Sequence, residues 1–264
     1  MFQGVLQKMI TEMATPVQYY MQLQDDFLSV NQLIGKKLRI EFSHFQCLNC
    51  GGSQPIFRQG FCKKCFFEVP QAADWVMNPE LSKAHLNIEH RDLAYEKQMQ
   101  LQPHCVYLAN SSSVKVGVTR ASQIPTRWID QGAHEALIIA QMPNRYLAGI
   151  TEVALKQHIS DKTNWRKMLT NTIDQTDLIQ IKNQLFPLMP SETKEFFAEQ
   201  TQPFHIQFPV EKYPTAVKSL NLLNTPTYEG TLSGIKGQYL IFEDNTVFNV
   251  RSNEGQVVRL AITN

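Results

Sequence analysis

The chain has 264 residues, 43% of them hydrophobic, with 25 Lys and Arg against 24 Asp and Glu. This length can bury a sizeable core and allows two or more modules. The formal net charge of +1 excludes a field that draws the whole molecule onto nucleic acid or an anionic membrane, so any such attraction must be local. No apolar run approaches the ~20 residues that cross a bilayer, and the N-terminus lacks a signal-peptide pattern, so we expect a cytoplasmic protein.

The two ends of the chain carry β patterns. Residues 1–46 and 211–264 have alternating or β-rich runs between polar and Gly-containing breaks, which predicts strands that pair into one small sheet or barrel. The middle is more varied, and the predicted fold class is therefore α+β. Its expected parts are a cysteine module at 47–70, a connecting loop and helix at 71–103, an α/β domain at 104–170 and a helical segment at 171–210.

Four of the five cysteines have the spacing CxxC–x11–CxxC. They are Cys47, Cys50, Cys62 and Cys65. Two tight turns can aim four thiolates at one Zn²⁺, and in a reducing compartment this spacing points to metal more than to disulfides. Four thiolates leave no open coordination position, so we expect a structural zinc ion. Cys105 lies within a predicted strand and is expected to be a buried small hydrophobe.

The cysteine module contains phenylalanines interspersed with basic residues. Phe57, Phe61, Phe66 and Phe67 are interleaved with Arg58, Lys63 and Lys64. Such a surface can stack bases and neutralise phosphates. The same pattern also fits phenylalanines that pack beneath the module with solvated lysines above, and the sequence favours neither interpretation.

The run VYLANSSSVKVGVTR at 106–120 predicts a β-hairpin. Side chains alternate across a strand, so one face of the second strand carries Val114, Val116 and Val118. If these valines face the core, then Tyr107, Lys115 and Gly117 share the opposite face. A glycine there allows close approach of a ligand or of backbone.

The residues after the hairpin predict two helices around a strand. Ser122 is a candidate N-cap for a short helix that sets Arg127 beside a buried stripe, and Gly132 ends it. The apolar run 136–140 predicts a central strand. A longer helix capped by Asn144 follows, and helical periodicity places Glu152 half buried at the edge of its core face.

This order of a hairpin, a helix with Arg, a strand, a helix with Glu and a late Asn resembles the GIY-YIG nuclease domain. The two tripeptides that name that family correspond to Cys105-Val106-Tyr107 and Lys115-Val116-Gly117. Lys115 stands where Tyr is usual, and the first tripeptide lacks its Gly. Over residues 40–170 the chain is also similar to an uncharacterised bacterial family that joins a zinc-binding cysteine module to a GIY-YIG-like region.

The resemblance implies a three-stranded antiparallel sheet with helices and a site for hydrolysing phosphodiesters. In that site Tyr107 and Lys115 help activate water, Arg127 steadies the phosphate, and Glu152 holds Mg²⁺ or Mn²⁺. Asn164 matches the late Asn of the family.

Local charge agrees with a nucleic-acid partner. Residues 104–170 hold eight Lys or Arg and four Asp or Glu, as expected where nucleic acid docks. We therefore expect a nucleic-acid-binding protein that acts as a metal-dependent endonuclease, or alternatively a non-catalytic adaptor or a protein-interaction module. The residues expected to contact nucleic acid outside the catalytic set are Arg58, Lys63, Lys64, Arg120 and Arg145.

Overall fold

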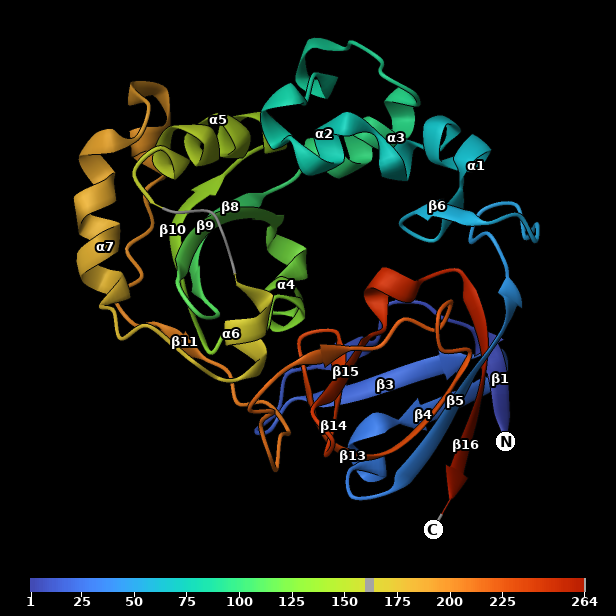
Figure 1. Ribbon diagram of the computed structural model, residues 1–264. Helices are drawn as coiled ribbons and strands as arrows, with labels where there is room; N and C mark the ends of the chain where they lie inside the picture. Colours follow the sequence, from blue (N-terminus) through green and yellow to red (C-terminus); the bar gives the residue numbers. More distant parts are fainter. Residues whose placement is uncertain (160–163, 264) are drawn as a thin grey trace.

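The structure is a computed structural model that describes residues 1–159 and 164–263, and these residues form a mixed α+β molecule (Figure 1). No helix within them is long and apolar enough to span a membrane. The helices are α1 (Lys63–Glu68), α2 (Asp74–Met77), α3 (Leu93–Gln100), α4 (Thr126–Asp130), α5 (Arg145–Lys156), α6 (Trp165–Leu169) and α7 (Leu178–Leu185). The first strands are β1 (Phe2–Val5), β2 (Ile10–Glu12), β3 (Gln18–Leu23), β4 (Asp26–Ser29), β5 (Lys37–Phe45), β6 (Ile56–Arg58) and β7 (Phe61–Cys62). The remaining strands are β8 (His104–Asn110), β9 (Val114–Arg120), β10 (Glu135–Met142), β11 (Phe204–His205), β12 (Lys218–Ser219), β13 (Thr227–Lys236), β14 (Tyr239–Phe242), β15 (Thr246–Asn249) and β16 (Gln256–Thr263).

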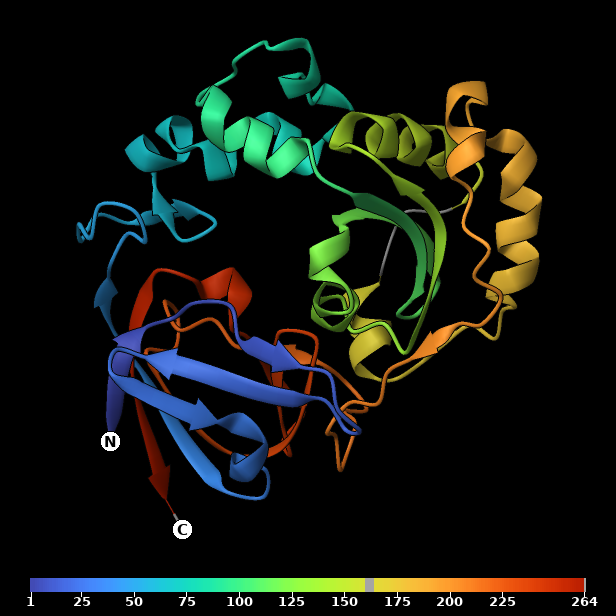
Figure 2. The ribbon, with the colours of Figure 1, turned by 180° about the vertical axis from the view of Figure 1, so that it is seen from behind.

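The two ends of the chain pair with one another, which confirms the expectation from their β patterns. The largest sheet has the strand order β1-β16-β5-β13-β14-β15-β12, with Phe2 opposite Leu260. A second sheet, β2-β3-β4, lies over it, and Figure 2 shows its strands from behind. Alternation explains the packing, because Tyr19, Met21 and Leu23 of β3 are buried in the core between the sheets. We call these two sheets together the terminal β-domain.

The central sheet differs from the three strands expected. Its order is β11-β10-β8-β9, all antiparallel, because the short strand β11 adds a fourth member beside β10. One face carries Val106 and Leu108 and packs against α5. The other face carries Tyr107 and belongs to the same hydrophobic core as the terminal β-domain, with Trp128 of α4 between them. The central sheet and the terminal β-domain are therefore joined by shared core packing.

Three helix boundaries show where the sequence predicts the ends of helices correctly and where it does not. Asn144 caps α5 as expected, because its side chain accepts a hydrogen bond from the amide of Leu147 at 3.0 Å. Ser122 is not an N-cap. It lies in a 3₁₀ turn, and α4 begins only after Pro125, whose ring occupies the cap position. Gly132, with φ of +67°, follows the end of α4 as expected.

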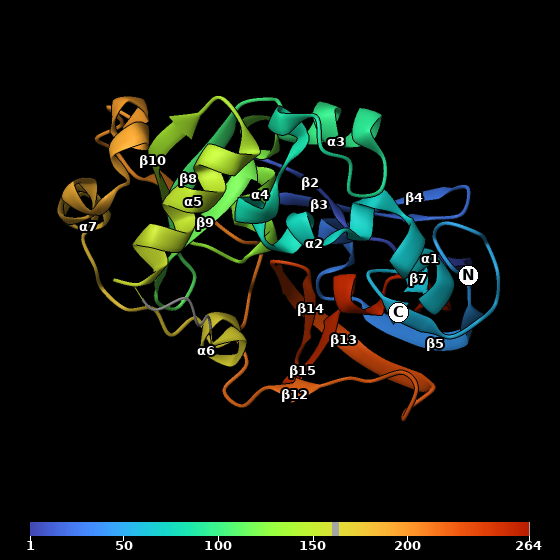
Figure 3. The same ribbon diagram turned by 90° about the horizontal axis from the view of Figure 1, so that it is seen from above.

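The segment 171–210 is less helical than its sequence indicates. Only α7 is an α-helix there, and 3₁₀ turns and β11 follow it. The cysteine module consists of β6, β7 and α1, and Figure 3 shows it from above, beside the terminal β-domain. Helices α2 and α3 lead from this module to the central sheet. The Pro79–Leu81 turn packs closely on α5, where a Cβ at Gly149 would lie 2.2 Å from the Glu80 amide. These contacts fix α2 relative to α5.

Candidate functional site

The β8–β9 register brings the predicted hairpin residues onto one face. Tyr107 lies opposite Gly117, and Lys115 lies opposite Ala109, while the valines of β9 face the other way. A Cβ at Gly117 would lie 2.7 Å from the Cζ and Oη atoms of Tyr107. The absent side chain at position 117 thus makes room for the tyrosine ring itself, where the sequence suggested a ligand or backbone.

Tyr107 is completely buried. Its Oη accepts a hydrogen bond from Nε2 of Gln131 at 3.0 Å, and its ring meets that of Trp128 edge-on, with centroids 6.0 Å apart. Burial raises the pKa of Tyr107, while the charge of Arg127 and hydrogen bonds from Arg127 and Gln131 act in the opposite direction. The phenol is therefore protonated at neutral pH and lies beside a guanidinium group.

Lys115 and Arg127 repel one another across the same face. Burial, together with the smaller effect of the charge of Arg127, lowers the pKa of Lys115 to about 8. Among the described residues, neither side chain has a carboxylate oxygen within 4.0 Å. Two cations without a carboxylate partner therefore lie close to Tyr107.

Glu152 and Asn164 have different surroundings. Glu152 is only 7% exposed and forms an ion pair with Lys156 at 3.0 Å. Burial raises its pKa, and Lys156 and Arg145 oppose that rise. The charge of Glu152 also acts on Tyr107. Asn164 is exposed, and its side chain caps α6 by accepting from two backbone amides, so the structure gives it a capping contact and none with the other four residues.

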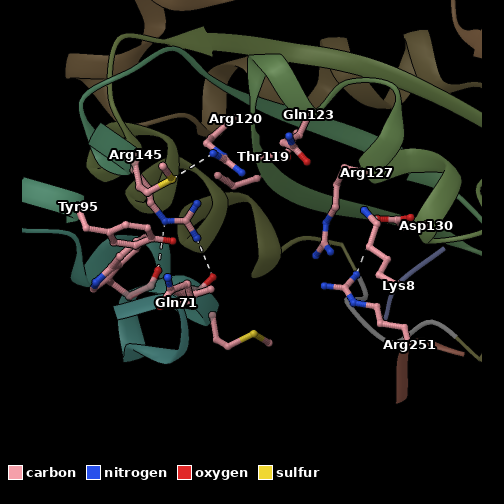
Figure 4. A pocket seen from close by; sticks show the side chains of 15 residues that line it. Lys8, Gln71, Tyr95, Thr119, Arg120, Gln123, Arg127, Asp130, Arg145 and Arg251 are labelled. Atoms are coloured by element: carbon pink, nitrogen blue, oxygen red, sulfur yellow. Dashed lines mark hydrogen bonds and ion pairs between the residues drawn. The ribbon is translucent and has the colours of Figure 1, made fainter. Parts of the chain in front are cut away.

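A cavity of about 240 Å³ lies beside this face, between the central sheet, helices α2 and α3 and the terminal β-domain (Figure 4). Figure 4 shows Arg145 and Tyr95 on one side, Arg127 and Arg251 on the other, and Arg120 between them. We call this the arginine cavity. Its charged side chains are five cations, Lys8, Arg120, Arg127, Arg145 and Arg251, and one carboxylate, Asp130.

The single carboxylate, on Asp130 of α4, pairs with both cations that the terminal β-domain contributes to the cavity. The side chain of Asp130 is only 3% exposed, lies 2.5 Å from Nζ of Lys8 and 3.8 Å from Arg251, and accepts a hydrogen bond from Gln238 at 2.8 Å. Within residues 1–159 and 164–263, Arg120, Arg127 and Arg145 have no carboxylate oxygen within 4.0 Å. Three arginines therefore face the cavity with their charges uncompensated by a direct ion pair.

Arg145 is held in place by backbone oxygens. It donates to the carbonyls of Trp75 at 3.2 Å and Val76 at 2.7 Å, and its guanidinium lies 5.6 Å from the centre of the Trp75 ring. Burial lowers its pKa to about 10, so it keeps its charge at neutral pH. Arg120 donates to the sulfur of Met99 at 3.1 Å. Both residues were expected to contact nucleic acid, and both line the cavity.

The four cysteines converge as their spacing predicts. Their Sγ atoms lie within 4.8 Å of one another, and those of Cys50 and Cys62 are 4.0 Å apart. Sulfurs around a tetrahedral zinc at ~2.3 Å are about 3.8 Å apart, so the cluster has the right size. Burial opposes ionisation of Cys47, but backbone amides, including that of Cys62 at 3.3 Å, lower its pKa to about 6. The four cysteines can hold a metal ion such as zinc. Cys105 is a buried thiol of β8.

The basic residues of the cysteine module lie outside the arginine cavity. Arg58, Lys63 and Lys64 are exposed. Phe57, Phe66 and Phe67 pack against one another with ring centroids 5.2 to 5.8 Å apart. Phe57 and Phe67 nevertheless keep 43% and 58% of their surface exposed, so both interpretations of this surface describe part of it.

Residues 35–258 match the model of the family described as "Protein of unknown function (DUF2797)". The chain belongs to this family. The matched range includes the cysteine cluster, the central sheet and every cationic residue of the arginine cavity except Lys8. No curated protein and no solved structure matches the chain.

Sequence reasoning missed part of this site. Lys8 and Arg251 come from opposite ends of the chain, and Tyr95 and Trp75 come from the connecting segment. No local pattern marks them, because they join the cavity only when the terminal strands pair and α2 docks on α5. A cation count over 104–170 identified Arg120, Arg127 and Arg145 but had no means of reaching Lys8 and Arg251.

Proposed function

We propose that this protein binds nucleic acid through the arginine cavity. The observation that carries the proposal is that Arg120, Arg127 and Arg145 face one cavity without a carboxylate partner within 4.0 Å among the described residues. A guanidinium group donates up to five hydrogen bonds in a planar fork that matches phosphate oxygens. Phosphate groups are therefore suitable partners for these arginines.

The concentration of charge supports a polyanion as the partner. The whole chain has a net charge of +1, whereas five cations and one carboxylate give the cavity a net charge of +4. A local basic surface on a nearly neutral molecule attracts phosphates at that surface alone. The exposed Arg58, Lys63 and Lys64 would extend the contact toward the cysteine module.

We further propose that the four cysteines bind a structural zinc ion and that the protein is cytoplasmic. Amide–sulfur hydrogen bonds around Cys47 favour its thiolate and support a cluster that a cation neutralises. None of the five cysteines is in a disulfide, in keeping with a reducing compartment.

The second candidate is a GIY-YIG-type endonuclease. The proximity of Arg127 to the hydroxyl of Tyr107 supports it, because phosphodiester hydrolysis needs a cation on the phosphoryl oxygens beside the group that activates water. In this mechanism Lys115 assists Tyr107, and Glu152 holds Mg²⁺ or Mn²⁺, which supplies Lewis-acid chemistry.

The surroundings of these residues favour binding over cutting. Tyr107 is fully buried with a raised pKa, which opposes a role as a base. Among the described residues only the four cysteines form a group of three or more potential metal ligands. With Glu152 as the one carboxylate ligand, a Mg²⁺ ion would need water and phosphate oxygens as its other ligands. The ion pair between Glu152 and Lys156 would compete with such an ion for the carboxylate.

Binding and cutting are tested separately. Arg127→Ala should weaken the binding of a fluorescent oligonucleotide about tenfold, while Arg39→Ala, an exposed arginine on β5 outside the cavity, should not change it. Absence of salt-dependent binding would contradict the proposal and favour a protein-interaction module. Cleavage with Mg²⁺ or Mn²⁺ that is lost in both Tyr107→Phe and Glu152→Gln would establish the endonuclease. Binding without cleavage would leave the non-catalytic adaptor.

A further inference from the structure

The arginine cavity also has lining residues without charge. Tyr95 of α3 lies on the same side as Arg145 (Figure 4), and Met77 and Met99 are further lining residues. Met77 is 71% exposed although its thioether side chain is apolar. The cavity therefore combines cations with an aromatic ring and two thioethers.

The rings of Tyr95 and Trp75 lie next to one another. The Trp75 ring lies 6.4 Å from that of Tyr95 between centroids and is only 4% exposed, whereas Tyr95 is half-buried, and both residues line the cavity. The Arg145 guanidinium lies 5.6 Å from the centre of the Trp75 ring and donates to the carbonyls of Trp75 and Val76. Tyr95 is thus a ring held beside a fixed guanidinium group, and the Nε1 atom of Trp75 has no hydrogen-bond partner among the described residues.

We propose that the arginine cavity receives one unpaired nucleotide of a single-stranded nucleic acid, with its base against Tyr95 and Met77 and its phosphate on Arg127 and Arg120. This inference rests on the proposed function, and it adds that the same site selects single-stranded over double-stranded nucleic acid. Stacking on an aromatic ring is a sequence-tolerant way to bind a base, and adjacent cations hold the backbone.

The cavity favours an unstacked base. A base within a helix is covered on both faces by its neighbours, so its face reaches the ring of Tyr95 only when it is unstacked. The volume of about 240 Å³ is below the roughly 300–1,000 Å³ of sites for drug-sized ligands. The small space therefore suits one nucleotide unit.

The test compares a single strand of about 12 nucleotides with a duplex of the same sequence, by fluorescence anisotropy on the full chain at several salt concentrations. We expect the wild type to bind the single strand roughly tenfold more tightly. Tyr95→Ala should weaken single-strand binding roughly 5- to 100-fold and leave duplex binding nearly unchanged. Tyr95→Phe keeps the ring and should retain the preference, which separates stacking from a loss of folding.

The alternative outcomes discriminate between the two proposals. Equal binding of strand and duplex, or equal losses for both in Tyr95→Ala, would overturn this inference and leave nucleic-acid binding intact. A nucleoside monophosphate that binds as tightly as the single strand would also overturn it, since the cavity would then serve a free nucleotide. Absence of salt-dependent binding to either oligonucleotide would overturn both proposals.

Discussion

The ring of Tyr107 lies against Gly117 on the neighbouring strand, and a Cβ atom at position 117 would be 2.7 Å from Cζ and Oη of that tyrosine. Because Tyr107 is fully buried under Gln131 and Trp128, its ring has little room to move. We expect Gly117→Ala to lower the free energy of unfolding by about 1–3 kcal/mol, as overpacking does. Urea denaturation measures this loss.

A double-mutant cycle identifies the cause. In a Tyr107→Leu background the ring is absent, so Gly117→Ala should cost much less than it does in the wild type. An equal cost in both backgrounds would contradict the interpretation that Gly117 makes room for Tyr107.

Asp130 opposes anion binding while it stabilises the fold. It is the only carboxylate in the described lining of the arginine cavity, and it pairs with Lys8 and Arg251. Asp130→Asn should lower the free energy of unfolding by about 1–3 kcal/mol and raise the cavity charge from +4 to +5. Binding of a single-stranded oligonucleotide at low salt should then tighten roughly 2- to 10-fold.

The control for this substitution is Asp26→Asn, which makes the same charge change at an exposed residue of β4 that does not line the cavity. It should leave both stability and affinity nearly unchanged. Weaker oligonucleotide binding by a folded Asp130→Asn variant would contradict the assignment of the cavity.

Lys236 makes stability depend on pH. It is completely buried, bonded to Asn171 at 2.8 Å, and burial lowers its pKa from 10.5 to about 8. Between these values the unfolded chain holds a proton that the folded chain has released, so stability rises with pH across this range. From pH 7 to pH 10.5, the unfolding free energy of the wild type should therefore rise by up to about 3 kcal/mol relative to that of Lys236→Met. Parallel stability curves for the two proteins would contradict this.

Metal binding should depend on the four clustered cysteines and not on the fifth. We expect about one zinc per chain by elemental analysis, and we expect Cys62→Ser to lose most of it. Cys105→Ala should keep the full metal content, because Cys105 lies in β8 outside the cluster. Equal metal content in the two variants would contradict a four-cysteine site.

Local sequence patterns predicted the parts of the site that lie within one element or in elements adjacent along the chain. Alternation placed Tyr107, Lys115 and Gly117 on one face, the CxxC spacing predicted the cysteine cluster, and Asn144 was recognisable as a cap. Each of these features depends on residues that are neighbours along the chain.

The features that escaped prediction depend on distant contacts. Strand β11 has only two residues and pairs with β10, so no sequence pattern predicts a fourth strand. The cavity needs Lys8 and Arg251, which meet through pairing of the two chain ends. The sequence indicated that Gly117 makes room for a ligand or for backbone, because it does not show that the ring of Tyr107 fills this space.

The most direct test of nucleic-acid binding through the arginine cavity is the salt dependence of single-strand affinity in Arg120→Ala/Arg127→Ala, compared with wild type and Arg39→Ala. Because the proposed complex places one phosphate on both arginines, the slope of log affinity against log salt should become shallower by about 0.7 in the double variant alone. A slope that is the same in all three proteins would contradict the account.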